Sequence, residues 1–319
     1  MPPRLALTLG DPAGIGPEIV LKALASPERP EADAVVYGPW GALSEHARRL
    51  QLPMPQDVGA RMVDVPDAER IPLGQVSAAG GRAAAEAVLR AAKDALAGRV
   101  DALVTAPLHK ESLHAAGYPW PGHTELLAEA AGTPDVAMMF VGGGLRVALL
   151  TIHRSLRSVP DAVSRVELLR VARLLGRSLP GFGVARARIA VCGVNPHAGE
   201  GGLFGSEERD VLAPAVAELR NEGLDVSGPF AADTLFLRAL KGEFDAVIAC
   251  YHDQGLIPVK LAAFGHAVNV TLGLPFVRTS VDHGTAFDIA GKGTAQETSF
   301  LTAMKLALEL VKGRRAPIR

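Results

Sequence analysis

Three histidines each lie just beyond an apolar run rich in β-branched residues. They are His153, His197 and His252, and the runs before them end at residues 152, 194 and 248. Such runs are typical of buried parallel strands, whose carboxyl ends meet at the edge where α/β enzymes place their chemistry. A single histidine is more often a surface or core residue than a ligand, but three in equivalent positions predict a metal site assembled by the fold.

Three imidazoles leave coordination positions open for a substrate, which is the arrangement of a catalytic rather than a structural metal. Ligation by imidazole alone suits zinc, cobalt or nickel better than magnesium, although the geometry also admits magnesium.

Residues able to bind an anion follow the His252 segment. Lys260 offers a point charge, Arg278 offers a bidentate donor, and Asn269 lies on the run between them. Each alone is equally compatible with a surface ion pair, and their nearness in sequence to His252 favours an anion site.

Two further candidates lie at predicted helix starts. His123 and Thr124 begin a helix after a segment rich in proline and glycine, where backbone amides favour an anion; alternatively, Thr124 only caps that helix. Asp233 either caps the helix that runs to Leu240 or points into the site.

The composition predicts an α/β protein: 48% of the 319 residues are hydrophobic and 5% are aromatic, and the formal charge of -1 argues against nucleic acid or an anionic membrane as partner. The longest stretch without charged residues contains glycines and proline, so no transmembrane helix is expected. A signal peptide is not visible, and the two cysteines lie inside strand-like runs as buried thiols, so we expect a cytoplasmic protein.

The elements alternate as strand, turn and helix, which predicts right-handed crossovers and a largely parallel sheet. The glycine-rich segment 10–18 after the first strand is either a turn whose amides face a ligand or only a tight strand-to-helix turn. The apolar runs 5–9 and 102–105 are expected to be strands, and the segment 78–97, rich in alanine, is expected to be a long amphipathic helix. Strands in 137–141 and 147–152 are expected to form a hairpin across the three glycines at 142–144. The dense glycine loop 195–208 predicts a close approach to a ligand or a second subunit.

The chain length favours two domains. We expect a first α/β domain of residues 1–120 plus 289–319, and a second of residues 121–288 that carries most of the metal and substrate site.

Seven long motifs in unbroken order closely resemble the 4-hydroxythreonine-4-phosphate dehydrogenase (PdxA) family. They are GDPAGIGPEI (10–19), TAPLHKESL (105–113), GHTELLAE (122–129), NPHAGEGGLFGSEE (195–208), DTLF (233–236), YHDQGLIPVK (251–260) and GLPFVRTSVDHGTAFDIAGKG (273–293). The resemblance implies NAD(P)-dependent oxidation of 4-phosphooxy-L-threonine to 2-amino-3-oxo-4-phosphooxybutanoate, whose decarboxylation gives 3-amino-2-oxopropyl phosphate in pyridoxal 5'-phosphate biosynthesis.

The resemblance also implies roles for individual residues. It assigns His153, His197 and His252 to one divalent metal (zinc, cobalt or magnesium), and His123, Thr124, Lys260, Asn269 and Arg278 to the substrate. It implies two α/β/α domains that flank a cleft, as in isocitrate and isopropylmalate dehydrogenases. A homodimer is implied as well, with one ligating histidine from the partner subunit, and we expect His252 to be that residue. The sequence does not identify cofactor-binding residues, nor does it decide between NAD and NADP.

A metal chelated by the substrate hydroxyl and amine favours both hydride departure and the enolate of decarboxylation. Asp233 and Asp253 are candidate proton acceptors or orienters of the histidines.

Rival interpretations remain at this point. They are a related dehydrogenase of 4-phospho-threonate or of a cis-dihydrodiol, a metal-dependent hydrolase, and, with least support, an acyltransferase of the same fold.

Overall fold

The computed structural model describes residues 2–65 and 70–315, which divide into two compact units. Of the described residues, the first unit comprises 2–65, 70–134 and 274–311, and the second comprises 135–273 and 312–315. The first boundary lies later than expected, because helix α5 (His123–Ala130) packs against α3 (Ala78–Leu96) of the first unit. The chain re-enters the first unit at residue 274, earlier than the expected residue 289, because the strand that carries Arg278 pairs with a strand of the first unit.

The first unit contains a parallel sheet in the order β3-β2-β1-β4-β11. Its strands are β1 (Arg4–Thr8), β2 (Asp33–Gly38), β3 (Arg61–Asp64), β4 (Ala102–Thr105) and β11 (Val277–Val281). Its helices are α1 (Gly16–Ala25), α2 (Trp40–Leu50), α3, α4 (Lys110–Ala115), α5 and α11 (Thr298–Arg315), with short 3-10 turns at Pro55–Val58 and Phe287–Ile289. Strands β1 and β4 are almost wholly buried, as the apolar runs predicted.

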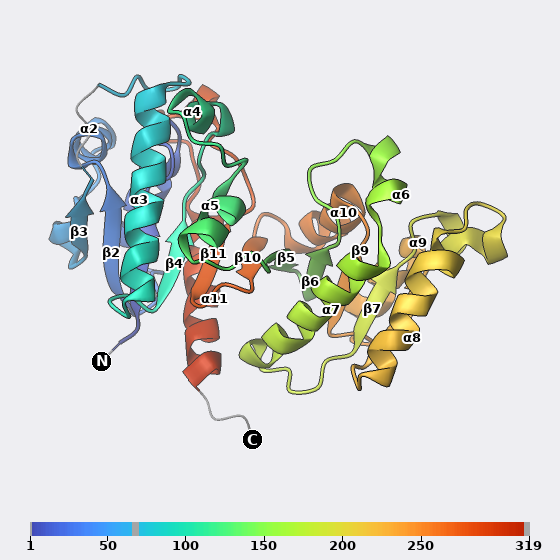
Figure 1. Ribbon diagram of the computed structural model, residues 1–319. Helices are drawn as coiled ribbons and strands as arrows, with labels where there is room; N and C mark the ends of the chain where they lie inside the picture. The colour runs from blue at the N-terminus through green and yellow to red at the C-terminus, as the bar shows by residue number, and fades with distance from the viewer. Residues whose placement is uncertain (1, 66–69, 316–319) are drawn as a thin grey trace. The chain divides into compact units, whose positions relative to one another are not determined.

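Helix α3 shows why this segment folds as expected. It is rich in alanine, and the hydroxyl of Ser77 caps its start by accepting from the Gly80 amide at 3.0 Å. The helix lies over β1, β2 and β4 and runs along the strands of the first unit (Figure 1), and it packs closely on α4. A Cβ at Gly81 would lie 1.9 Å from the Ser112 carbonyl oxygen, so only glycine permits that approach.

The second unit contains a mixed sheet in the order β10-β5-β6-β9-β7-β8. Its strands are β5 (Ala137–Gly142), β6 (Leu145–Leu149), β7 (Ile189–Cys192), β8 (Val226–Phe230), β9 (Ala246–Ala249) and β10 (Val268–Leu272). Its helices are α6 (Val159–Ala162), α7 (Arg165–Ser178), α8 (Ala213–Asn221), α9 (Ala232–Leu240) and α10 (His252–Ala263). Short turns lie at Leu156–Ser158, Leu179–Phe182 and Pro196–Gly202, and a π-helical turn lies at Glu208–Leu212. The predicted hairpin is confirmed, because β5 and β6 pair antiparallel.

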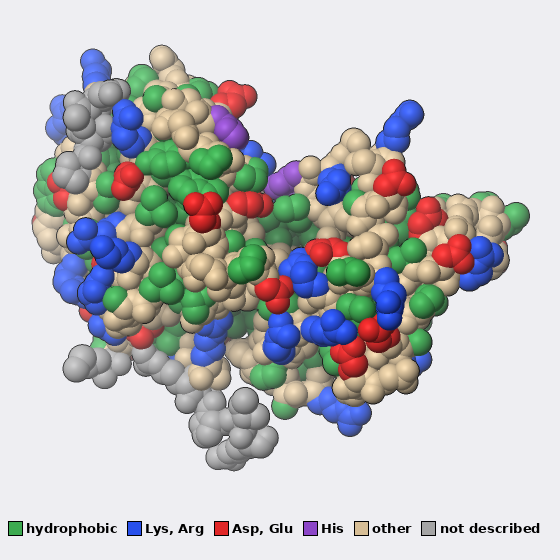
Figure 2. Space-filling model, in the orientation of Figure 1, with side chains coloured by type: hydrophobic (Ala, Val, Ile, Leu, Met, Phe, Trp, Pro, Cys, Tyr) green, Lys and Arg blue, Asp and Glu red, His purple; other side chains and the backbone are tan. Residues whose placement is uncertain are grey.

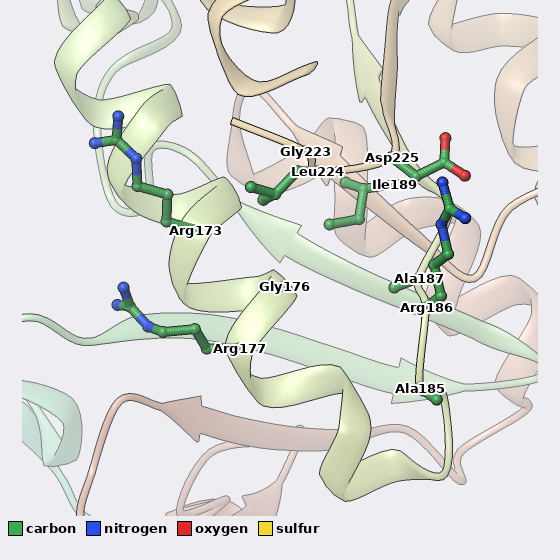
Figure 3. Close-up of a pocket in the computed structure, with 10 residues that line it drawn as sticks. All are labelled: Arg173, Gly176, Arg177, Ala185, Arg186, Ala187, Ile189, Gly223, Leu224 and Asp225. Atoms are coloured by element: carbon green, nitrogen blue, oxygen red, sulfur yellow. The ribbon is translucent and has the colours of Figure 1, made fainter. Parts of the chain in front are cut away.

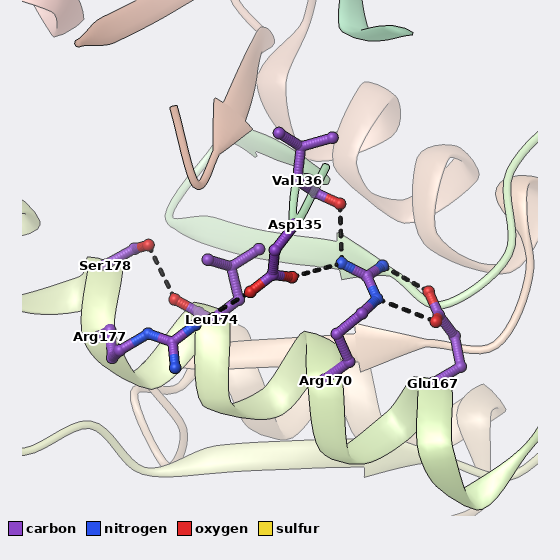
Figure 4. Close-up of polar contacts among 7 residues, drawn as sticks. All are labelled: Asp135, Val136, Glu167, Arg170, Leu174, Arg177 and Ser178. Carbon is purple, nitrogen blue, oxygen red and sulfur yellow. Dashed lines mark hydrogen bonds and ion pairs between the residues drawn. The ribbon is translucent and has the colours of Figure 1, made fainter. Parts of the chain in front are cut away.

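A group of charged side chains fixes the start of β5 on α7 (Figure 4). Arg170 donates to Asp135 Oδ1 at 2.8 Å and to the Val136 carbonyl at 2.9 Å, and it also pairs with Glu167. The hydrogen bond to Glu167 raises the pKa of Arg170. Because these groups are partly exposed, each pair contributes at most about 1 kcal/mol, and the network chiefly sets where β5 begins.

The surface over α7 and α8 mixes both signs of charge (Figure 2). Arg165 pairs with Glu218, and Arg173 pairs with Glu222 at 2.5 Å. This face therefore presents no broad basic field of the kind that binds a nucleic acid backbone. Within residues 2–65 and 70–315, no helix combines the length and apolar character that crossing a membrane requires.

Candidate active site

His153 and His252 approach one another at the carboxyl ends of β6 and β9. The chain beyond β6 continues alongside the chain beyond β9: the Leu150 amide donates to the Ala249 carbonyl at 2.8 Å, and the Thr151 hydroxyl donates to the Cys250 carbonyl at 2.7 Å. These bonds place the ring centroids of the two histidines 5.7 Å apart. Two of the three predicted metal ligands therefore meet within one chain.

Asp253 contacts His252 directly. The Nδ1 atom of His252 lies 2.7 Å from Asp253 Oδ1. The carboxylate therefore engages Nδ1 and not Nε2 of this imidazole. A carboxylate on the second ring nitrogen is the usual way to orient a metal-binding imidazole. Of the two roles that the sequence leaves open for Asp253, proton acceptor or orienter of a histidine, this contact is compatible with the second.

Gln254 is a residue that the sequence did not single out. Its Oε1 accepts from the Cys250 amide at 2.6 Å, and its Nε2 donates to the Gly193 carbonyl at 2.7 Å, which ties the end of β9 to the end of β7. The role depends on two strands being neighbours, which no local pattern reveals. Both cysteines are buried as predicted, and burial raises the pKa of the Cys192 and Cys250 thiols.

His197 lies on a left-handed turn beyond β7. Residues 197–201 all have positive φ, between 43° and 81°. Three of them are not glycine, namely His197, Ala198 and Glu200, and at roughly 1–2 kcal/mol each the turn stores roughly 3–6 kcal/mol of strain. The predicted glycine loop is thus more contorted than its composition alone indicates, and the side chain of His197 is exposed.

The three histidines do not form one cluster in a single chain. In the part of the chain that the structure describes, no three His, Cys, Asp or Glu side chains lie close enough to hold a metal ion. One chain supplies the His153 and His252 pair, and the ring of His197 lies instead 6.3 Å from that of Phe204. The expected homodimer, with one ligand from the partner subunit, allows for such an incomplete set.

Asp233 is exposed in the first turn of α9, which packs against the turn at Pro196–Gly202. The N-cap of α9 is Ala231, with no side-chain hydrogen bond, so Asp233 is not the cap of this helix. It remains a candidate proton acceptor beside the His197 turn.

Lys260 lies in the last turn of α10, and Asn269 lies on β10. Lys260 is exposed and is eight residues beyond His252 on the same helix, a rise of about 12 Å. The Oδ1 atom of Asn269 is buried and has no hydrogen-bond partner among the described residues. A buried acceptor without a donor costs about 1–3 kcal/mol, which favours a ligand or water donor at this position.

Arg278 is buried in the first unit with only 2% of its surface exposed. Its guanidinium donates to Thr105 Oγ1 at 2.8 Å, and Thr105 also bonds to the Ser280 hydroxyl at 2.9 Å. Burial lowers the pKa of Arg278 to about 9, and the nearby Glu125 carboxylate opposes this effect. The group therefore remains a cation at neutral pH in surroundings where a charge is poorly solvated, which favours an anionic ligand.

His123 and Thr124 lie beside Arg278 at the start of α5. Burial and the positive charge of Arg278 lower the pKa of His123 well below its usual 6.5, so its imidazole is neutral at pH 7. Its Nε2 atom is shielded and has no hydrogen-bond partner among residues 2–65 and 70–315. The N-cap of α5 is Gly122, so the interpretation of Thr124 as the helix cap is wrong. Thr124 is buried and lies with His123 in the first turn.

The glycine-rich segment 10–18 is a tight turn whose amides are used internally. The Asp11 amide donates to the Pro107 carbonyl at 3.0 Å and the Ile15 amide to the Thr285 carbonyl at 2.9 Å. Asp11 Oδ1 accepts from the Ala13 amide at 3.0 Å. Of the two alternatives for this segment, the structure favours the turn without a ligand on its amides.

A second polar group at this edge was not predicted from the sequence. Burial raises the pKa of Asp11, whose Oδ2 has no hydrogen-bond partner in the described part of the chain. The ring of His109 stacks on Phe287 with centroids 4.6 Å apart. Asp11 lies in motif 10–19 and His109 lies in motif 105–113. The motifs therefore indicated this region, although not these two side chains.

A cavity of about 400 Å³ lies elsewhere in the second unit (Figure 3). It is lined by Arg173 and Arg177 of α7 and by Ile189 and Asp225, at the amino ends of β7 and β8. The predicted histidines follow the carboxyl ends of the strands, so this cavity is not the metal site. Arg173 and Arg177 also pair with Glu222 and Asp135.

Sequence comparison gives a consistent result. The family described as "Pyridoxal phosphate biosynthetic protein PdxA" matches residues 28–307. The chain is 44% identical to the 4-hydroxythreonine-4-phosphate dehydrogenase of Geobacter metallireducens, over 97% of this chain and 96% of that protein. It is 45% identical to the D-threonate 4-phosphate dehydrogenase of Cupriavidus necator, over 98% of each.

Solved structures agree with the sequence relatives. A 4-hydroxythreonine-4-phosphate dehydrogenase from Klebsiella pneumoniae superposes with a TM-score of 0.89 at 44% identity, covering 97% of this chain and 99% of that one. A terephthalate 1,2-cis-dihydrodiol dehydrogenase from Burkholderia xenovorans gives 0.66 at 36% identity, covering 96% and 97%. A β-decarboxylating dehydrogenase from Thermococcus kodakarensis gives 0.52 at 15%, covering 97% and 84%, which confirms the expected fold class alone.

Proposed function

Because this chain belongs to the family of the pyridoxal phosphate biosynthetic protein PdxA, we propose that it oxidises 4-phosphooxy-L-threonine with NAD or NADP in a metal-dependent reaction. The product, 2-amino-3-oxo-4-phosphooxybutanoate, decarboxylates to 3-amino-2-oxopropyl phosphate. Its close relatives are dehydrogenases, so it is an oxidoreductase. The observation that carries the proposal is the His153 and His252 pair, with Asp253 on one ring and with motif positions like those of the family.

The donor atoms fit a divalent cation. Metal–nitrogen bonds of about 2.1 Å place the centroids of two neighbouring imidazole ligands roughly 5 Å apart. The centroids of His153 and His252 are 5.7 Å apart, and Asp253 engages Nδ1 of His252 so that Nε2 faces away from the carboxylate. A cation held by His153, His197 and His252 would supply Lewis-acid stabilisation of the substrate oxygen.

The other candidates bind and orient the substrate in this proposal. Arg278 supplies a positive charge at neutral pH for its phosphate or carboxylate, and Lys260 adds a second charge from α10. Neutral His123 and buried Thr124 supply hydrogen bonds without adding charge. Asn269 Oδ1 accepts a hydrogen bond from the bound ligand. Asp233 beside the His197 turn is the candidate proton acceptor.

We further propose that the enzyme is a homodimer in the cytoplasm. Helices α9 and α10, together with Phe264 just beyond the end of α10, expose large apolar side chains; the helical ones are Leu237, Leu240, Ile257 and Leu261. Leu261 is 69% exposed and Phe264 is 86% exposed, which is unusual for several large residues on neighbouring helices. A second copy would cover this face and bring a metal ligand with it. The two buried, free cysteines suit a reducing compartment.

Mixed dimers test whether a ligand crosses and which one. Variants with His153→Ala, His197→Ala and His252→Ala are co-expressed in pairs. A pair complements when its two ligands come from different chains, and random pairing then restores about a quarter of the sites. The one pair that fails to complement contains the two ligands of the same chain. Failure of all three pairs would show that every ligand acts within its own chain.

The substrate is tested by direct assay. Purified, metal-loaded protein is mixed with NAD or NADP and 4-phosphooxy-L-threonine, and the absorbance of the reduced nicotinamide and the release of carbon dioxide are followed. The second candidate is D-threonate 4-phosphate, because a relative with that activity is as similar as those named for the first substrate. The ratio of kcat/KM for the two substrates decides between them, and absence of nicotinamide reduction with either would refute the proposal.

A further inference from the structure

The carboxylate of Glu208 packs against the left-handed turn that carries His197. The Glu208 side chain is buried, with 5% of its surface exposed. Its Oε1 accepts from the backbone amide of Asn195 at 2.7 Å, and its Oε2 accepts from the side-chain amide of Asn195 at 3.0 Å. Both oxygens thus fix the residue from which the turn departs.

Two glycines leave room for this carboxylate. A Cβ at Gly193 would lie 3.1 Å from Glu208 Oε1, and a Cβ at Gly199 would lie 2.7 Å from Oε2. Gly199 is the central residue of the left-handed turn, with a φ of 81°. The carboxylate therefore lies between the end of β7 and the middle of the turn, in contact range of both.

The carboxylate of Glu208 accepts its hydrogen bonds from uncharged amide groups. Among the described residues, Lys, Arg and His side chains form no ion pair with it, and its hydrogen bonds are the two from Asn195. A buried carboxylate of this kind is retained at a desolvation cost, which a purely structural position could avoid with an apolar residue. Glu208 also begins the π-helical turn at Glu208–Leu212, a feature that occurs frequently at functional sites.

We propose that Glu208 is a positioning residue for the reaction: it locks residues 197–201 in the left-handed conformation and so presents the His197 imidazole in a fixed direction. Left-handed residues other than glycine persist only where their surroundings determine them. Here the two hydrogen bonds from Asn195 to Glu208, and the close packing of Glu208 against Gly199, hold the turn in this conformation. The inference rests on the proposed function for the role of His197, whereas the locking of the turn is independent of it.

Glu208→Gln is the principal variant. Glutamine keeps the shape, but it presents an NH2 group to one of the two Asn195 donors, so one bond is lost. Glu207→Gln is the matched control, because Glu207 Oε2 accepts from the same Asn195 side-chain amide at 2.7 Å and is only half-buried. The two variants therefore remove neighbouring carboxylates that share a partner, and only one of them contacts the turn.

Three measurements are made on the full-length protein. Hydrogen exchange reports the protection of residues 195–207 without metal. Titration with Co²⁺, followed by its visible absorption, reports metal affinity and ligand geometry. Thermal melting reports global stability. We expect Glu208→Gln to lose protection in this turn and to bind Co²⁺ about 10- to 100-fold more weakly with an altered spectrum. We expect Glu207→Gln to resemble the wild type.

The outcomes separate the two claims. Loss of turn protection with no Co²⁺ binding by any variant, wild type included, supports the lock and refutes the proposed metal site. Wild-type protection and Co²⁺ affinity in Glu208→Gln refute the lock. Equal losses of protection and Co²⁺ affinity in both variants also refute it, because the negative charge of the loop as a whole, and not the contact of Glu208 with the turn, would then be the cause.

A second variant protects the test against misfolding. If Glu208→Gln does not fold, Asn195→Ala removes the side-chain bonds to Glu208 at 3.0 Å and to Glu207 at 2.7 Å and keeps the backbone bond to Glu208. The same loss of protection and Co²⁺ affinity is expected, with Glu207→Gln showing that the bond to Glu207 is not its cause. In a folded double variant, the effects of Glu208→Gln and Gly199→Ala on Co²⁺ affinity should be less than additive, since both act through one turn. Strict additivity would count against the shared mechanism.

Discussion

Replacing Arg278 by methionine should weaken substrate binding without destabilising the protein. Burial lowers the pKa of Arg278 from the usual value of an arginine to about 9, a difference of roughly three and a half pH units. At about 1.4 kcal/mol per pH unit, this difference corresponds to an unfavourable term of up to roughly 5 kcal/mol in the folded protein. Methionine of similar length removes that term and gives up hydrogen bonds from a charged donor, such as the one to Thr105, which is worth about 1.5–3 kcal/mol. We therefore expect Arg278→Met to be at least as stable as the wild type.

The sign of the pH dependence follows from the direction of the shift. Between about pH 9 and 12.5 the folded protein binds fewer protons at this group than the unfolded chain does. The penalty is thus fully present below about pH 9 and fades as the pH rises toward 12.5. The stability advantage of Arg278→Met should be largest at neutral pH and should shrink in alkaline solution.

The effect on substrate binding has the opposite sign. Hydrogen bonds from a charged donor are worth about 1.5–3 kcal/mol, so losing them should raise the substrate KM about 10- to 150-fold, with a smaller effect on cofactor binding. Urea unfolding of the protein without substrate, and steady-state kinetics with it, measure the two effects. Arg173→Met is the control, because Arg173 is paired with Glu222 at the surface and should leave KM unchanged.

Two results would refute this reasoning. A clearly lower free energy of unfolding for Arg278→Met would show that the buried charge is already compensated within the protein. An unchanged KM would show that Arg278 does not bind the substrate. Arg278→Lys refines the second result, since it keeps the charge and loses the bidentate geometry, and its KM should lie between those of the wild type and Arg278→Met.

Three further outcomes are expected. His197→Ala should abolish turnover and Co²⁺ binding together, as assayed by kinetics and by titration; full activity would remove the argument for a metal. Asp253→Asn should lower Co²⁺ affinity about 10- to 100-fold by releasing Nδ1 of His252, and wild-type affinity would show that the contact has no orienting role. Leu261→Glu should shift the protein toward monomers in sedimentation and reduce activity in parallel, because a charge would enter the proposed dimer interface; an unshifted dimer would place the interface on another face.

Much of the fold follows from local patterns in the sequence. Apolar runs of strand length predicted β6, β7 and β9, and the alanine-rich segment after Ser77 predicted α3, because burial and helix propensity act over a few neighbouring residues. The three glycines at 142–144 predicted the β5–β6 hairpin. The motifs also sufficed to place the chain in its family, since they preserve the order and identity of residues along nearly the whole sequence.

The tertiary structure decided what depends on contacts between distant segments. It brought His153 beside His252, buried Arg278 against Thr105, and placed the carboxylate of Glu208 under the turn that carries His197. It also showed that amides of segment 10–18 are satisfied within the segment and by other loops, and that Thr124 does not cap α5. Residue type sets which chemistry a side chain is capable of, but burial and hydrogen-bond partners set its charge and direction, and these come from residues far away in the chain.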